Sequence, residues 1–225
     1  MSLSQERPQN PAKHFMKIKS GTVNYYDKEE GDNVNVPTPL EFIVLDQLAT
    51  IKGWSDQDES GYWSNEVRRV GTDPLTVRTK NGVKEVGIWK EIKGSPSVAG
   101  AKYNSSVYIA TKGRNGMEIN NLGLTGAALN AWIEFTQKNR VNQVKITLTG
   151  WEDAKKGSVA YKVPVFEASE MTDAERDEAI KLDKELQGYL AQYFDYVPEE
   201  EKHDEVVAVD DVDEEETISL EDIPF

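Results

Sequence analysis

Residues 40–52 read LEFIVLDQLATIK and form the longest of several segments in which β-branched, aromatic and other apolar side chains predominate. The purely apolar part, Phe42 to Leu45, is far shorter than the roughly 20 residues that span a bilayer. Gly, Asn, Asp and Pro separate this segment from its neighbours, as turn residues separate strands. The stretch therefore predicts a long strand in a β-rich globular domain.

Similar segments recur from residue 13 to residue 166. The expected strands are His14–Lys19, Leu40–Lys52, Tyr62–Arg69, Leu75–Thr79, Val86–Ile92, Tyr103–Thr111, Met117–Leu122, Gln143–Trp151 and Val159–Phe166. Asn81 and Gly82 both tolerate positive φ and predict a hairpin turn. A second hairpin with a charged tip is expected where residues 152–157 join the last two strands.

Two helices interrupt or follow these strands. Thr125 to Lys138 carries apolar residues at helical spacing behind a threonine that could begin the helix. A second helix is expected at about residues 172–197, because Thr172 and Glu175 have the spacing of a capping box. Its apolar face should pack on the sheet.

The net charge of -14 would ordinarily argue against nucleic-acid binding, which depends on Lys and Arg at the phosphates. The distribution of acidic and basic residues along the chain reverses that argument. Residues 199–225 hold 13 acidic residues and one lysine, whereas residues 1–166 hold 22 basic and 18 acidic residues. We expect a flexible arm over 1–12, a folded domain over 13–198 and a disordered acidic tail over 199–225.

Several classes of protein are disfavoured. The chain has no cysteine and only His14 and His203, which excludes disulfides and most zinc chemistry. Residues 113–116 lack the ending of a phosphate-binding loop, and the acidic loop 56–59 is expected to be an exposed loop rather than a metal site. We therefore predict no enzyme, no metal and no cofactor. The polar residues 1–13 indicate no export, which favours a cytoplasmic location.

The last six residues are Leu220-Glu221-Asp222-Ile223-Pro224-Phe225. Acidic groups, two apolar side chains and a terminal carboxylate suit a partner that has basic groups beside an apolar pocket. The ending resembles that of bacterial single-stranded DNA-binding proteins, whose acidic tails finish in an aspartate run followed by Ile-Pro-Phe. Leu220 stands where that family usually has another acid. The expected partner-binding residues are Glu221, Asp222, Ile223, Pro224 and Phe225.

In architecture and length the folded domain resembles phage-encoded single-stranded DNA-binding proteins. That resemblance implies an OB-fold, an oligonucleotide-binding five-stranded β-barrel, here with extra hairpins, one inserted helix and a C-terminal helix. It also implies a protein that coats single-stranded DNA during replication, recombination and repair. The tail would recruit a polymerase, helicase or nuclease in the cytoplasm, that of the host if a phage encodes the chain.

Aromatic and basic residues are interleaved along the strand region. Binding of single-stranded DNA without sequence preference needs flat rings for the bases and cations for the phosphates. If Val107 and Val67 face the core, Tyr108 and Arg68 point away from it. The residues expected to bind single-stranded DNA are Trp54, Trp63, Arg68, Arg78, Lys102, Tyr108 and Arg114.

One alternative uses the same tail differently. The chain could bind replication factors, or mimic DNA to inhibit them, without coating DNA. If the chain does coat single-stranded DNA, the charge distribution further predicts that the tail competes with DNA for the basic region. Titration with a single-stranded oligonucleotide separates the two interpretations.

Overall fold

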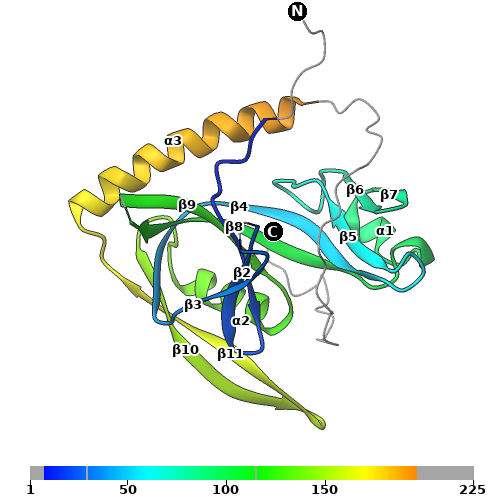
Figure 1. Cartoon of the computed structure of the whole chain (residues 1–225), viewed down its shortest axis with the longest axis horizontal. Helices are drawn as coiled ribbons and strands as arrows, with labels where there is room; N and C mark the ends of the chain where they lie inside the picture. Colours follow the sequence, from blue (N-terminus) through cyan, green and yellow to red (C-terminus); the bar gives the residue numbers. More distant parts are fainter. Residues whose placement is uncertain (1–7, 29, 115, 197–225) are drawn as a thin grey trace, which may run out of the picture.

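The computed structural model describes residues 8–28, 30–114 and 116–196, in which strands predominate (Figure 1). The strands are β1 (Phe15–Lys19), β2 (Thr22–Asp27), β3 (Asp32–Val36), β4 (Leu40–Ser55), β5 (Ser60–Ser64), β6 (Leu75–Thr79), β7 (Gly82–Gly87), β8 (Ala101–Gly113), β9 (Gly116–Leu124), β10 (Lys145–Lys156) and β11 (Val159–Ser169). The helices are α1 (Trp89–Ile92), the 3-10 turn η1 (Pro96–Val98), α2 (Gly126–Lys138) and α3 (Asp173–Asp195).

Strand β4 organises the sheet. Along one edge it pairs with β8 from Phe42 to Gly53, and along the other it pairs first with β10 and then with β5. A bulge between Val44 and Asp46 bends it. The main path runs β3-β2-β1-β9-β8-β4-β5-β6-β7, with β10 and β11 branching from β4. The mainly β prediction is confirmed, but no pairing among the described residues closes the sheet into a barrel.

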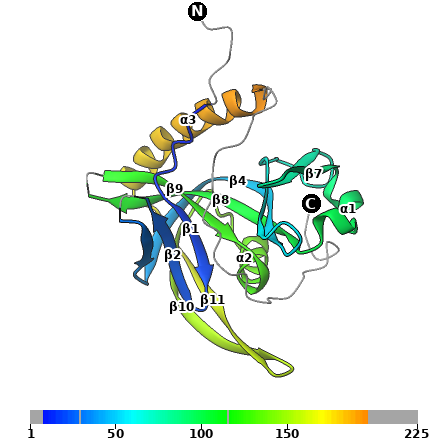
Figure 2. The same ribbon diagram turned by 45° about the vertical axis from the view of Figure 1, so that its right-hand side comes forward.

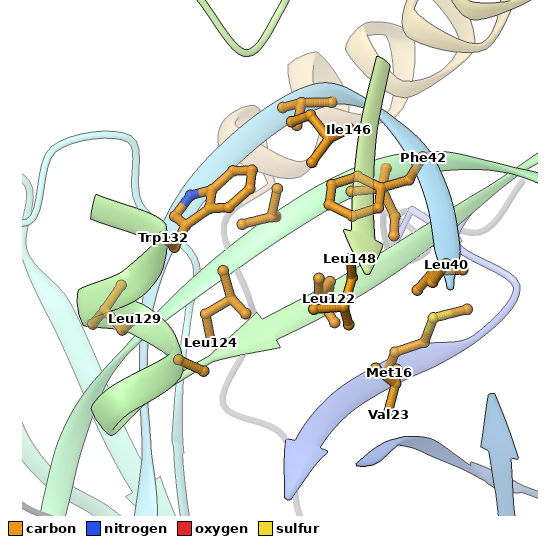
Figure 3. Packing of buried hydrophobic residues seen from close by; sticks show 14 residues of the cluster. Met16, Val23, Leu40, Phe42, Leu122, Leu124, Leu129, Trp132, Ile146 and Leu148 are labelled. Atoms are coloured by element: carbon orange, nitrogen blue, oxygen red, sulfur yellow. The ribbon is translucent and has the colours of Figure 1, made fainter. Parts of the chain in front are cut away.

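The main core lies inside the curl of this sheet (Figure 3). Apolar side chains of β1, β2, β4, β8, β9 and β10 converge there, and α2 covers one side. Trp132 of α2 is 1% exposed, packs its ring edge-to-face on Phe166, and donates its indole N–H to Gln47. Helix α2 begins after Thr125 as predicted, although no hydrogen bond from the Thr125 side chain caps it.

A second core lies between β5, β6 and α1, on the side of the molecule away from β10 and β11 (Figure 2). Tyr62, Leu75, Val77 and Trp89 are buried in it. Tyr103 of β8 packs against both this core and the main core. The segment between β4 and β8 therefore folds as a lobe rather than as a simple loop.

Helix α3 covers the opposite face of the sheet from α2 (Figures 1 and 2). The capping box is present: the Thr172 hydroxyl accepts from the Glu175 amide, and the Glu175 carboxylate accepts from the Thr172 amide. Leu186 and Leu190 are fully buried beside Leu48 of β4. The predicted C-terminal helix is confirmed.

The strands differ from the prediction at three places. Of the predicted strand Tyr62–Arg69, only residues 62–64 lie in a strand, β5. The segment Val86–Ile92 is only partly extended, since Trp89 to Ile92 form α1 and bury two apolar side chains against the lobe. The hairpin of β2 and β3 was not predicted, because its polar residues hide the strand pattern. The hairpin at Asn81-Gly82 is confirmed, and Gly82 has a φ of 102°. The β10–β11 hairpin is also confirmed, although its strands extend further than expected.

Part of the expected N-terminal arm packs on the sheet. Ala12 is buried, and the Asn10 amide donates to the Tyr108 hydroxyl at 2.9 Å. The expected tail, residues 199–225, lies outside the described residues. Among the helices of the described residues, none is long and apolar enough to cross a membrane.

Candidate nucleic-acid interface

Four side chains form a continuous row across neighbouring strands. In the registers of the sheet, Lys102 of β8 pairs with Lys52 of β4, Lys52 with Trp63 of β5, and Trp63 with Arg78 of β6. Directly paired residues point to the same face, with Cβ atoms about 4.5–5.5 Å apart. We call these four residues the Trp63 row. Three of them, Trp63, Arg78 and Lys102, were predicted from the sequence.

The row lies on the face of the sheet that points away from both cores, here called the outer face. The neighbours of the row along their strands, Ile51, Tyr62, Val77 and Tyr103, all contact the second core. Successive residues of a strand point to opposite faces, so the row points outward. Lys52 is exposed, and the three other members are half-buried.

Helix α3 lies on the same outer face but over a different part of it. Its contacts are with Leu48, Tyr108 and Ile119, further along β4, β8 and β9. The outer face is therefore divided into a part that α3 covers and a part that carries the row.

The row is electrostatically coupled to the next strands. Crowding by the surrounding protein lowers the pKa of the Lys52 amine, although the side chain as a whole is exposed. The Glu66 carboxylate opposes this shift, and Lys17 of β1 adds to it. Lys17 lies on the same outer face, because it pairs with Gly123 of β9 and Gly123 pairs with Ser106 of β8. The outer face therefore carries cations on β1, β4 and β8, with the Glu66 carboxylate beside them at Ser106.

Trp54 sits at the neck between the sheet and the lobe. Its side chain is half-buried, and its carbonyl lies 2.4 Å from the point where a Cβ on Gly100 would lie. Gly100 has a φ of 91°, so a side chain there would be strained as well as crowded. The backbone at Trp54, near the end of β4, can approach Gly100 this closely only because Gly100 lacks a side chain. This contact holds Trp54 in place on β4, two residues after Lys52.

Arg68 is exposed, as predicted, but its guanidinium is occupied. It forms an ion pair with Asp46 at 3.0 Å, donates to Gln187 of α3, and lies 5.3 Å from the centre of the Phe194 ring. Arg68 therefore ties α3 to β4 beside the row.

Tyr108 requires a correction. It lies on the opposite face from Val107 and Ile109, as expected, yet it is fully buried because α3 covers that part of the face. Its hydroxyl donates to Glu66 at 2.8 Å, and burial together with Glu66 raises its pKa. A base cannot reach this ring, and we remove Tyr108 from the candidate interface.

Arg114 is exposed in the turn just beyond the far end of β8. Twelve residues separate it from Lys102, a distance of up to about 40 Å along a strand. The structure does not bring it together with the row. The expected partner-binding residues, Glu221 to Phe225, lie outside the described residues.

The acidic loop 56–59 is not uniformly exposed as expected. Asp58 is buried, and its carboxylate accepts from Thr79, Asn81 and Lys84. The Lys84 contact, followed by the other two, lowers the pKa of Asp58 to about 2. Asp58 therefore fastens the turn between β6 and β7. In the described part of the chain, no group of three His, Cys, Asp or Glu residues could hold a metal ion.

Lys52 was missed by the sequence analysis. Its position two residues before Trp54 places both on the same face of a regular strand, and this spacing could have identified it. No family model, curated protein or solved structure matches this chain.

Proposed function

We propose that this protein binds single-stranded DNA on the outer face of its sheet, without preference for sequence. The observation that carries the proposal is the Trp63 row, in which an indole lies between cations on adjacent strands. Every base has a flat face that can stack on an indole, and every nucleotide has a phosphate that Lys or Arg can neutralise. An interface of this kind reads no base edges.

The arrangement of strands supports relating the fold to an OB-fold. In chain order β4, β8, β9, α2, β10 and β11 give five strands with a helix after the third, and the first strand pairs with both the second and the fourth. An OB-fold is a partly open five-stranded barrel that binds oligonucleotides on its second and third strands and their flanking loops. The first of those loops corresponds to the lobe that carries Trp63 and Arg78.

One departure is clear. The edge of β9 that would complete the barrel pairs with β1, in parallel, from Phe15 to Lys17. We propose that the fold is an OB-fold opened at this seam, with the β1–β2–β3 hairpins inserted there.

Within this proposal the protein coats single-stranded DNA during replication, recombination and repair. The acidic ending Glu221 to Phe225 recruits a polymerase, helicase or nuclease, and the work is done in the cytoplasm, that of the host if a phage encodes the chain. No step of this role needs catalysis, a metal or a cofactor.

The test reverses the charge of one lysine on β4 and of one lysine on β8. The variant Lys52→Glu with Lys102→Glu should lose at least about tenfold in affinity for oligo-dT, and the slope of log affinity against log salt should fall by roughly one and a half. The matched control is Lys112→Glu with Arg114→Glu, which changes the net charge equally at the other end of β8. The control should retain most of the affinity.

Equal losses in both variants would contradict a localised interface. If the unmodified protein does not retain oligo-dT at low salt, the proposal is wrong, and the alternative of a protein that binds replication factors without DNA is favoured.

A further inference from the structure

Two large aromatic side chains are exposed on the β1–β2 hairpin. Phe15 of β1 is 52% exposed and Tyr26 of β2 is 48% exposed. They lie opposite each other. Met16 pairs with Tyr25 in the antiparallel register, so Phe15, one residue before Met16, faces Tyr26, one residue after Tyr25. Tyr25 packs against the main core, so Tyr26 points to the other face.

The registers place these aromatic residues on the outer face. Phe15 pairs with Asn121 of β9, and Asn121 pairs with Tyr108 of β8, which points outward. Lys17 pairs in the same way with Gly123, and Gly123 with Ser106. Phe15 and Lys17 therefore lie on the outer face. Phe15 is level with Tyr108, where α3 covers β8, and Lys17 is level with Ser106, nearer the Trp63 row.

A single exposed apolar residue is ordinary on a protein surface. Here two aromatic residues are adjacent and are flanked by Lys17. Lys17 is level with Ser106 of β8, four residues along that strand from Lys102 of the row. Aromatic rings with lysines beside them at two places on one face suit a stacked, negatively charged strand.

We propose that Phe15 and Tyr26 form a second base-stacking position for the same strand of DNA, which then crosses the sheet from β5 to β1. This inference rests on the proposed function. Trp63 and Phe15 are separated by four strand spacings and by six residues along β8, a distance of at most about 28 Å. At a stacked spacing of about 3.4 Å per nucleotide, about eight nucleotides connect the two positions.

The experiment compares a short and a long oligonucleotide. Phe15→Ala with Tyr26→Ala should leave the quenching of tryptophan fluorescence by dT4 unchanged, because dT4 fills only the Trp63 end. The same variant should bind dT12 at least about fivefold more weakly. Phe15→Trp, in a chain that keeps Tyr26, retains a flat ring and should bind dT12 as tightly as the unmodified protein.

Ile180→Ala is the control, since Ile180 is 47% exposed on α3 and lies outside this path. It should change neither affinity, and circular dichroism should show all variants folded. Unchanged dT12 binding in the double variant, with weakened binding in Trp63→Ala, would overturn the second position and leave the proposed function intact. Absence of dT12 binding by the unmodified protein would overturn both.

Discussion

At the scale of single residues, Glu66 joins three parts of the molecule. Its carboxylate accepts hydrogen bonds from Ser106 and Tyr108 of β8, and its backbone N–H donates to the Tyr193 hydroxyl of α3 at 2.7 Å. The Tyr108 hydroxyl also accepts from Asn10 of the N-terminal segment. These contacts hold α3 and residues 8–14 on the sheet and so define where the open part of the outer face begins.

The first prediction concerns Tyr108. Tyr108→Phe removes a buried hydroxyl that serves both Glu66 and Asn10, and should lower the free energy of unfolding by about 1–3 kcal/mol in urea titrations. Because the ring is buried, the affinity for oligo-dT should not change. A large loss of DNA affinity in a protein of unchanged stability would show that Tyr108 contacts DNA after all.

The second prediction concerns pH. The pKa of Asp58 is lowered from an ordinary value of 3.8 to about 2, so the unfolded state binds the proton first as pH falls. The stabilisation from Asp58 is complete above about pH 4 and disappears as pH falls toward 2. In Asp58→Asn the thermal midpoint should be lower at pH 7 and should change less between pH 4 and pH 2. Identical acid profiles for the two proteins would exclude this role.

The sequence showed which side chains point to the outer face of the sheet, but it did not show which of them another element covers. Alternation along β8 correctly separated Tyr108 from Val107, but only the folded chain shows that α3 covers Tyr108 while Lys102 stays partly exposed. Trp63 and Arg78 were chosen for their chemistry. Their direct pairing follows from a register that local sequence does not specify.

At the scale of elements, strands with a buried face were predictable and polar ones were not. The core positions of β4 and β8 carry regular apolar residues, whereas β2 and β3 contain Asn24, Asp27, Asp32 and Asn33. Helix α3 was predicted because its capping box and apolar face are both local signals. Helix α1 was not, since its four residues are too few to show a helical period.

The third prediction tests the packing of α3. Leu186 is fully buried, so Leu186→Ala should lower the free energy of unfolding by about 2–5 kcal/mol. Ile180→Ala on the same helix should change it by no more than about 0.5 kcal/mol, because Ile180 is exposed. Equal effects of the two substitutions would mean that α3 does not pack on the sheet as described.

At the scale of the whole molecule, the separation of charge can be read from the sequence, whereas the topology of the sheet cannot. The separation of a basic region from the acidic residues 199–225 is visible in the sequence. The topology is not, because the pairing of β4 with β8, β5 and β10 joins segments up to about a hundred residues apart. The expected five-stranded barrel was an inference from resemblance, and in the described residues β9 pairs with β1, so that no pairing closes the sheet.

The fourth prediction follows from this separation of charge. Deleting residues 199–225 removes 13 acidic residues and one lysine. If the acidic residues compete with DNA for the positive outer face, the shortened chain should bind oligo-dT more tightly at low salt, and the difference should shrink as salt screens both interactions. Weaker binding after the deletion would contradict the competition.

The central claim, that the Trp63 row binds single-stranded DNA, can be tested with the tryptophans themselves. The chain has five, and their indole N–H groups give separate signals in a nitrogen–proton NMR spectrum. On addition of oligo-dT, we predict that the Trp63 signal moves or broadens, while those of the buried Trp89 and Trp132 stay in place. A Trp63 signal that does not change at saturating oligo-dT would contradict the account.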